Sequence, residues 1–431
     1  MGSVAGSSRS RKVRAGLAAA LLALGVGIGI WLVQRGAERR ASGPLRHEVY
    51  VWQRTWTEAV SASVSQNTQK FGRVVVLLGE VSWEGGRPVL TQAEADWGLL
   101  RDKPVGIALR IGSYSGPFDE DAPATRSLVD VCAGLLRHVR QQGIAPQEFQ
   151  IDFDCAESKL AGDRIWLAAI RREMGDTPLT ITALPAWTKR REFAELVRST
   201  DGYVMQVHSF ERPRNSAASL QLCDPELAKQ AVERCGRLGV PFRVALPTYG
   251  YVAGFGKDGK LLGLSAEGPA VTWPADATLR EVRAEAAAMA GLVRHWTADR
   301  PAAMTGIIWY RLPNEQDVLN WRMVTLDAVM AGREPKPVVR VEQRSPEPGL
   351  IEVELTNAGD ADGELARSVT ITWDRTPLLA SDGVGDYSRE AETGRVRFAL
   401  AGQSRLLAPG ARVAVGWLRF ESATTVQATA E

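Results

Sequence analysis

The sequence predicts an α/β chain built on a (β/α)8 TIM barrel, preceded by an apolar N-terminal segment and followed by a small all-β domain. Two observations predict the barrel. Eight short β-rich runs recur along the chain, and several of the longer segments between them carry apolar residues at helical spacing. A third observation predicts the all-β domain, because beyond residue 337 the runs are separated by turn residues only.

Residues 16–33, GLAAALLALGVGIGIWLV, contain no charged side chain and follow a basic tail at residues 1–15. This segment is just long enough to cross the hydrocarbon core of a bilayer. The charged linker at residues 34–45 contains no small-residue cleavage pattern. We therefore expect an uncleaved transmembrane anchor, with a cleaved signal peptide as the alternative. The excess of basic residues before the segment favours a cytoplasmic N-terminus and a barrel across the membrane.

The predicted barrel covers residues 46–331. Helical spacing between its strands is illustrated by Leu128, Cys132 and Leu135, with Gly143 placed to end that helix. An open doubly wound sheet is the alternative, but no glycine-rich phosphate-binding sequence follows the first β-rich run. The eight runs are residues 48–56, 73–83, 104–113, 148–154, 179–187, 202–210, 241–250 and 305–312.

Two features extend the barrel. Near residues 254–269, an Asp-Gly pair between apolar flanks predicts a hairpin insertion over the barrel mouth, followed by a helix around residues 279–296. Residues 332–337, GREPKP, have the composition of a linker. Residues 338–431 alternate as the strands of a β-sandwich, and we expect that domain to be an accessory module.

Composition argues against some classes of partner. Lys and Arg number 52 against 50 Asp and Glu, so charge gives no indication of nucleic-acid binding. No motif indicates a cofactor. The four cysteines suggest no disulfide framework, since Cys223 and Cys235 bracket a predicted helix that would hold them beyond disulfide reach. Protein partners and oligomeric state stay open.

The fourth run, FQIDFD, raises the question of function. Side chains of a strand alternate between its two faces, so Gln150, Asp152 and Asp154 share one face. Carboxylates on that face need water, a counter-charge or a ligand, because burying them unpaired is costly. We expect this face to point into the barrel, near the strand ends where barrel active sites lie, and Arg110 to lie within ion-pair reach.

The ends of the other predicted strands carry aromatic and polar side chains that suit a polysaccharide or oligosaccharide, since sugar rings stack on aromatics and hydroxyls bond to acids and amides. For each tryptophan the alternative is core packing, and for Arg110 it is neutralisation of the acids. A metal at Asp152, Asp154 and His208 is a less favoured alternative, because no second histidine is suitably spaced. The candidate substrate-binding residues are Trp52, Glu80, Trp83, Arg110, Trp187, Gln206, His208, Tyr249 and Trp309.

Short motifs carry two resemblances. The D-x-D of IDFDCAE, the P-x-Y-G at residues 247–250 and Trp309 are distantly similar to motifs of the family 18 (chitinase-like) glycoside hydrolases. The runs DFDC, LPAW, QVHSFE and LPTYGY are more similar to an uncharacterised bacterial barrel family, domain of unknown function 3142. The second resemblance implies no known activity. It does imply that the expected anchor lies in a bacterial inner membrane, with the barrel in the periplasm or otherwise outside the cytoplasm.

The chitinase-like resemblance implies acid-assisted glycosidic cleavage, with Asp154 stabilising positive charge and Glu157 protonating the leaving oxygen. The chain departs from the family pattern, whose acid falls at Ala156 here, so a bulge or early strand end is needed to turn Glu157 inward. Val207 and His208 replace a Tyr-Asp pair. Two functions stay open: a glycoside hydrolase-like barrel acting on an envelope or environmental polysaccharide, and a carbohydrate-binding barrel that has lost its catalytic acid.

The membrane anchor gives the first testable prediction. The full-length chain is expected in the membrane fraction of the cell, and a chain lacking residues 16–33 in the soluble fraction, because lipid is the preferred solvent of that segment. Fractionation followed by immunoblotting measures both. A full-length chain that stays soluble without being shortened contradicts the anchor.

Overall fold

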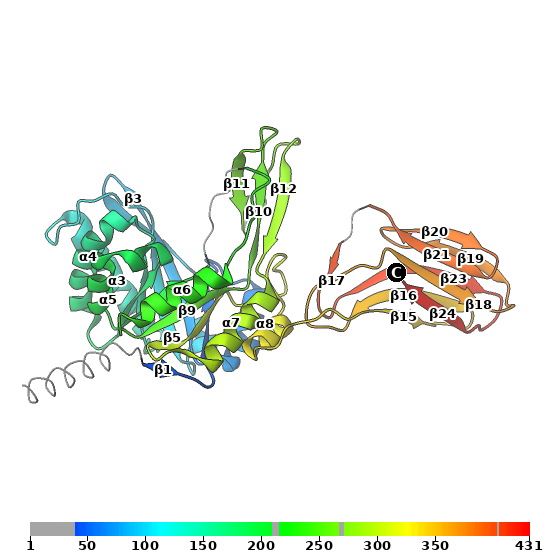
Figure 1. The fold of residues 1–431 in the computed structure, drawn as a ribbon, viewed down its shortest axis with the longest axis horizontal. Coiled ribbons are helices and arrows are strands. Elements are labelled where there is room, and N and C mark those ends of the chain that lie inside the picture. Colours follow the sequence, from blue (N-terminus) through cyan, green and yellow to red (C-terminus); the bar gives the residue numbers. More distant parts are fainter. Residues whose placement is uncertain (1–38, 209–214, 267–270, 403–404) are drawn as a thin grey trace, which may run out of the picture.

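The computed structural model describes residues 39–208, 215–266, 271–402 and 405–431. They form a barrel, a small sheet that projects from it, and a separate β domain (Figure 1). The predicted anchor at residues 16–33 lies outside the described residues. Within the described ranges, no helix is long and apolar enough to cross a membrane.

The barrel is a closed sheet of eight parallel strands. Each strand pairs with the next one in chain order, and the last pairs with the first, placing Trp309 opposite Val49. This closure confirms the predicted (β/α)8 barrel over the open sheet. The strands are β2 (Arg46–Val51), β3 (Val74–Glu84), β5 (Val105–Ile111), β6 (Phe149–Asp152), β7 (Leu179–Ala183), β8 (Gly202–Gln206), β9 (Phe242–Pro247) and β14 (Met304–Tyr310).

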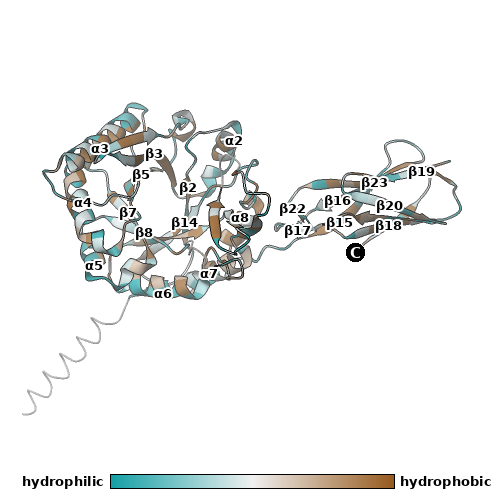
Figure 2. Cartoon of the chain, turned by 90° about the horizontal axis from the view of Figure 1, so that it is seen from above, coloured by the Kyte–Doolittle hydropathy of each residue, from teal (hydrophilic) through white to brown (hydrophobic). Residues whose placement is uncertain are grey.

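Helices surround the barrel, as the view turned by 90° shows (Figure 2). Most crossovers contain a helix, but β3 and β5 are joined by the antiparallel strand β4 (Arg87–Gln92) and the short 3-10 helix η2 (Trp97–Leu100). The predicted end of the first long helix is confirmed, because Gly143 follows it with a φ of 82°. The helices are α2 (Glu58–Asn67), α3 (Pro123–Gln141), α4 (Leu160–Met174), α5 (Arg191–Arg198), α6 (Pro225–Gly236), α7 (Ala286–Ala298) and α8 (Met323–Met330). Cys223 precedes α6 and Cys235 lies in its last turn, and both are free thiols.

The insertion after the seventh barrel strand contains the predicted hairpin and a third strand that was not predicted. It is a three-stranded antiparallel sheet of β10 (Gly250–Phe255), β11 (Leu261–Ser265) and β12 (Thr278–Arg283), which stands out from the barrel in Figure 1. The predicted helix from residue 279 is therefore wrong over its first turns, and α7 begins only at Ala286. Pairing with β10 along its whole length makes residues 278–283 a strand, a long-range interaction that local spacing does not reveal.

The β domain consists of two antiparallel sheets around a common core, as expected for a sandwich. Val353 and Leu418 contribute to that core from one sheet, and Ile371 and Phe398 from the other. The first sheet contains β15 (Val339–Arg344), β16 (Leu350–Asn357), β23 (Arg412–Phe420) and β19 (Leu378–Gly383); the second contains β20 (Tyr387–Glu392), β21 (Arg395–Leu400), β18 (Ser368–Trp373) and β24 (Val426–Ala430). Short pairs are β17 (Gly363–Glu364) with β22 (Leu406–Leu407), and β1 (Arg40–Ala41) with β13 (Arg300–Pro301).

An ion cluster lies inside the N-terminal end of the barrel. Both terminal nitrogens of Arg243 donate to Glu148, at 2.7 and 2.6 Å, and Arg243 also pairs with Glu48. Thr180 donates to the same Glu148 carboxylate at 2.9 Å. Burial alone would raise the pKa of Glu148, but the charge and hydrogen bonds of Arg243, with help from Arg73, lower it to about 2. The cluster is saturated with its own partners.

Removing Arg243 is expected to destabilise the barrel strongly. Arg243→Met leaves Glu48 and Glu148 buried without their main counter-charge, which should cost about 3–5 kcal/mol in the free energy of unfolding. The matched change Arg110→Met, at a half-exposed side chain, should cost less than about 1 kcal/mol. Urea unfolding measures both, and equal losses at the two positions would show that the cluster is not the stronger interaction.

Candidate functional site

The acidic strand faces the barrel interior, as predicted. Deepest on this face, the Gln150 side-chain oxygen accepts a 2.6 Å hydrogen bond from the hydroxyl of Tyr50, an interior residue of the first strand. One layer higher, Asp152 is buried and accepts hydrogen bonds from Thr182 at 2.6 Å and from the Gln206 amide at 3.2 Å. Neighbouring strands therefore supply the donors that an inward carboxylate requires.

Asp154 lies just beyond the end of β6, and its side chain remains accessible to solvent. The amide nitrogen of Gln206 lies 3.4 Å from an Asp154 oxygen, so one amide contacts both carboxylates. The barrel walls displace part of the hydration of Asp154. That burial, followed by the charge of Asp152, raises the pKa of Asp154 to about 7 against the opposing effects of Arg110 and Gln206.

Asp152 and Asp154 differ in how well their charges are stabilised. Burial also raises the pKa of Asp152, but hydrogen bonds from Thr182 and Gln206 and the charge of Arg110 oppose that shift. Asp152 therefore has more groups that stabilise its carboxylate, and its negative charge contributes to the raised pKa of Asp154.

Two arginines face these acids from neighbouring strands. The predicted contact of Arg110 with the acidic strand is confirmed, since its Nε lies 4.0 Å from an Asp152 oxygen. Its Nη1 lies 3.9 Å from Glu80. Glu80 also accepts a 2.5 Å hydrogen bond from Arg54, which lies beyond the end of β2. Cations and acids thus alternate across the mouth from Arg54 to Asp152.

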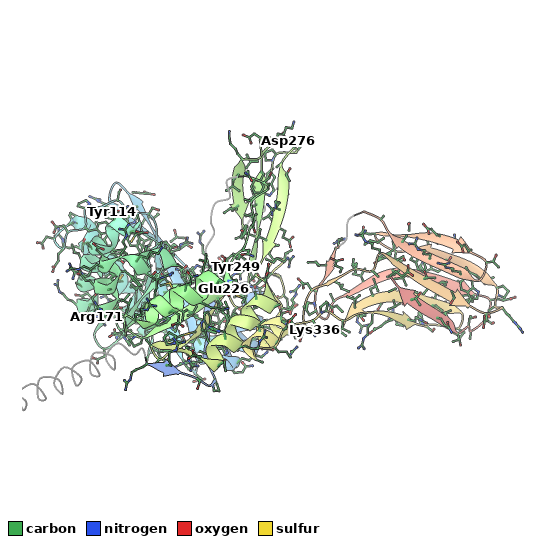
Figure 3. The ribbon with its side chains drawn as sticks, in the orientation of Figure 1. Tyr114, Arg171, Glu226, Tyr249, Asp276 and Lys336 are labelled. Atoms are coloured by element: carbon green, nitrogen blue, oxygen red, sulfur yellow. The ribbon has the colours of Figure 1, made fainter. Side chains whose placement is uncertain are left out.

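An aromatic wall lies beside this network. Tyr310 packs against His208, Tyr249 and Trp52, with ring centroids 5.4, 5.4 and 5.5 Å apart. Tyr249 lies where the projecting sheet joins the barrel (Figure 3). His208 is only 7% exposed, and burial lowers its pKa to about 4, so the ring is neutral at physiological pH. Its Nε2 has no hydrogen-bond partner among the described residues.

Tyr310 is the site residue that the sequence analysis missed, and Trp309 was chosen in its place. On β14 the inward residues are Ile308 and Tyr310, so Trp309 points outward. Trp309 is 0% exposed, and its Nε1 donates to the ring nitrogen of His47 at 3.1 Å. Side chains alternate along a strand, so Tyr310 follows from Ile308 once Ile308 is known to point inward. The sequence alone does not show which of the two faces of β14 points inward.

Two other predicted tryptophans pack against neighbouring groups. Trp187 is buried, and its Nε1 donates to the carbonyl oxygen of Cys155 at 3.2 Å. Trp83 packs on Tyr114 with ring centroids 4.2 Å apart, and it donates to the carbonyl oxygen of Gly112 at 3.2 Å. For these side chains the structure supports the core-packing alternative.

Glu157 is placed away from the acidic pair. It begins the short 3-10 helix η3 (Glu157–Lys159) after the strand has ended, and its carboxylate forms an ion pair with Arg190. It also borders a groove of about 670 Å³ beside η4 (Pro185–Lys189) and the start of α6. No hydrogen bond or ion pair joins Glu157 to Asp152 or Asp154 within the described residues.

The metal alternative has little geometric support. In the described part of the chain, no three histidine, cysteine or acidic side chains come close enough together to hold a metal ion. Asp152 and Asp154 meet at Gln206, whereas His208 is surrounded by the rings of Tyr249 and Tyr310. The candidate site is therefore a mouth of acids, arginines and aromatic rings.

Family models match both folded parts of the chain. Residues 119–315 match the model described as Domain of unknown function (DUF3142), which confirms the family resemblance of the barrel. Residues 340–421 match a model described as Domain of unknown function (DUF8456). No curated protein matches the sequence.

Solved structures similar to this chain include chitinases. Chitinase ChiA74 from Bacillus thuringiensis is 9% identical, with 90% of this chain and 100% of that chain covered and a TM-score of 0.43. A chitinase from Chromobacterium violaceum is 14% identical over 67% of this chain and 97% of its own, with a TM-score of 0.44. The GH18 chitinase ChiB from Flavobacterium johnsoniae is 14% identical over 68% and 94%, with a TM-score of 0.43.

The different positions of Trp309 and Tyr310 can be tested by stability. Trp309→Ala empties a fully buried site and should lower the free energy of unfolding by about 3–5 kcal/mol. Tyr310→Phe removes only a hydroxyl at the mouth and should change it by less than about 1 kcal/mol. Urea unfolding of the two variants provides the comparison. A small loss for Trp309→Ala would mean that its ring is not packed in the core.

Proposed function

We propose that the barrel mouth binds a polysaccharide and cleaves a glycosidic bond, with Asp154 as the proton donor. The observation that carries this proposal is the placement of Asp154 at the C-terminal end of the barrel, open to solvent and with a pKa of about 7. A general acid works best when its pKa lies near the working pH, because it is then protonated yet able to give up the proton.

The neighbouring residues suit the steps of such a reaction. Asp154 would protonate the glycosidic oxygen as its bond to the anomeric carbon breaks. A water oxygen would then bond to that carbon, and the proton released by the water would return to the Asp154 carboxylate. Asp152 would act as a positioning residue, because it holds Gln206 and its charge keeps the pKa of Asp154 high. Trp52 and Tyr310 offer aromatic faces against which sugar rings can pack.

In this proposal the proton donor is Asp154, whereas the chitinase-like resemblance implied Glu157. The Glu157 carboxylate forms an ion pair with the guanidinium of Arg190 at the start of η3, after the acidic strand has ended. Asp154 accepts only a long contact from Gln206 and faces the open end of the barrel. The chain's own residues thus favour a donor two positions after Asp152, on the same strand face.

A carbohydrate-binding barrel without catalysis is the second candidate function. The observation that favours it is the position of Glu157, since the acid expected from the chitinase-like pattern is replaced by Ala156 and the nearest glutamate is paired elsewhere. With either function, we propose that residues 16–33 anchor the chain in the bacterial inner membrane. The barrel would then meet an envelope polysaccharide outside the cytoplasm.

Substituting Asp154 separates the two functions. In an enzyme, Asp154→Asn should keep the fold and lower turnover by about 10²–10⁴-fold, as expected for loss of a general acid. Wild-type turnover should fall as the pH rises above about 7, because Asp154 then loses the proton it must donate. Reducing-end release from a panel of glycans measures both.

The control is Asp130→Asn, which makes the same chemical change at an exposed position on α3 and should leave turnover unchanged. A second variant tests the role of Asp152. Asp152→Asn removes the neighbouring charge, so the upper pH limit of turnover should move to lower pH. Binding of a glycan without any release of reducing ends would support the binding barrel.

A further inference from the structure

We infer that the polysaccharide is acidic, and that Arg110 binds a carboxylate group on its sugars. This inference rests on the proposed function and names its substrate class. It starts from the hydrogen-bonding state of Arg110, the cation that lies between Glu80 of β3 and Asp152 of β6.

Arg110 has unused donors at the open end of the barrel. Its side chain is 49% exposed, and its nearest acids lie 3.9 and 4.0 Å away, beyond ordinary hydrogen-bond distance. Among the described residues, no acceptor forms a hydrogen bond with it. A guanidinium carries a planar fork of N–H donors whose best-matched partner is a carboxylate bound through two parallel hydrogen bonds.

Two other arginines of the barrel bind acids through short hydrogen bonds. Arg243 holds Glu148 through two hydrogen bonds of 2.7 and 2.6 Å. Arg54 holds Glu80 through one of 2.5 Å. If Arg110 served only to neutralise Asp152, a contact of similar length would be expected. The longer distances leave room for an acidic ligand to complete the donor fork.

Among the described residues, the charged side chains that link Arg54 to Asp152 balance one another. Arg54 and Arg110 face Glu80 and Asp152, so these four side chains have no net charge when both acids are ionised. Asp154 adds a negative charge only when it loses its proton. An anionic sugar is therefore accepted more readily while Asp154 is protonated, which is also the state needed for acid catalysis.

This coupling gives acidic ligands a property that neutral ligands lack. Binding of a carboxylate next to Asp154 should favour the protonated form of Asp154, and by linkage protonation should favour binding. The affinity for an acidic glycan should thus fall as the pH rises through about 7, while the affinity for its neutral form should change little. His208 adds no charge in this range, because burial lowers its pKa to about 4.

The test uses pairs of polymers that differ only in charge. Oligosaccharides of polygalacturonate, alginate and hyaluronan are each compared with their carboxyl-reduced forms, by calorimetric titration at about pH 5.5 and about pH 8. Wild type should bind at least one acidic member more tightly than its reduced form. Arg110→Gln should weaken that binding by roughly tenfold or more, because a charge-assisted bond is lost.

Two further variants control for charge and folding. Arg110→Lys keeps the charge but loses the fork, and should retain part of the affinity. Arg191→Gln removes the same charge from an 88% exposed side chain on α5 and should have no effect. Unfolding curves confirm that each variant is folded, so a loss of affinity is a property of the site.

The outcomes separate this inference from the proposed function. Equal binding or cleavage of acidic and reduced forms, or an equal loss of both in Arg110→Gln, overturns the acidic substrate while the carbohydrate-active barrel stands. Wild type that neither binds nor cleaves any acidic or neutral glycan overturns both. The inference is supported if Arg110→Gln loses affinity for the acidic oligosaccharide but not for its carboxyl-reduced form. The wild-type affinity for the acidic oligosaccharide should also fall between about pH 5.5 and about pH 8.

Discussion

The structure depends on one constraint, the closure of a parallel sheet into a ring whose interior has no edge and little water. Any charged side chain that points inward must then be stabilised by other inward side chains or by the open end. At the lower end, Arg243 meets that requirement for Glu48 and Glu148. At the upper end, Thr182 and Gln206 meet only part of it for Asp152, and Asp154 depends on solvent. The same physical rule thus produces a lower cluster whose acids are paired with Arg243, and an upper cluster in which Asp154 is left to solvent.

Most of the barrel could be predicted because its signals are local. Alternation marked the strands, helical spacing marked several crossovers, and Gly143 marked a helix end. The projecting sheet could not be predicted in full, because β12 is held by pairing with β10, more than twenty residues earlier in the chain. Within residues 278–283 nothing local distinguishes a paired strand from the first turns of a helix.

The site was partly predictable for the same reason. Asp152, Asp154 and Gln206 are on strand ends whose inward face follows from their own sequence, and the structure brings them together. The tryptophans were harder to place, since a bulky aromatic ring suits either side of a barrel wall. The inward phase of β14 is set by its pairing with β2 and β9, so the choice between Trp309 and Tyr310 required the closed ring.

The filled interior also determines the route by which protons travel. Tyr50, Val204 and Ile308 occupy the centre of the barrel, and the Arg243 cluster lies beneath them. Among the described residues, these side chains separate Asp154 from the lower end of the barrel, while Asp154 itself is exposed at the mouth. A glycan lying across the mouth would cover that exposed side chain. Asp154 would then enter a complex in the protonation state that it had in contact with solvent.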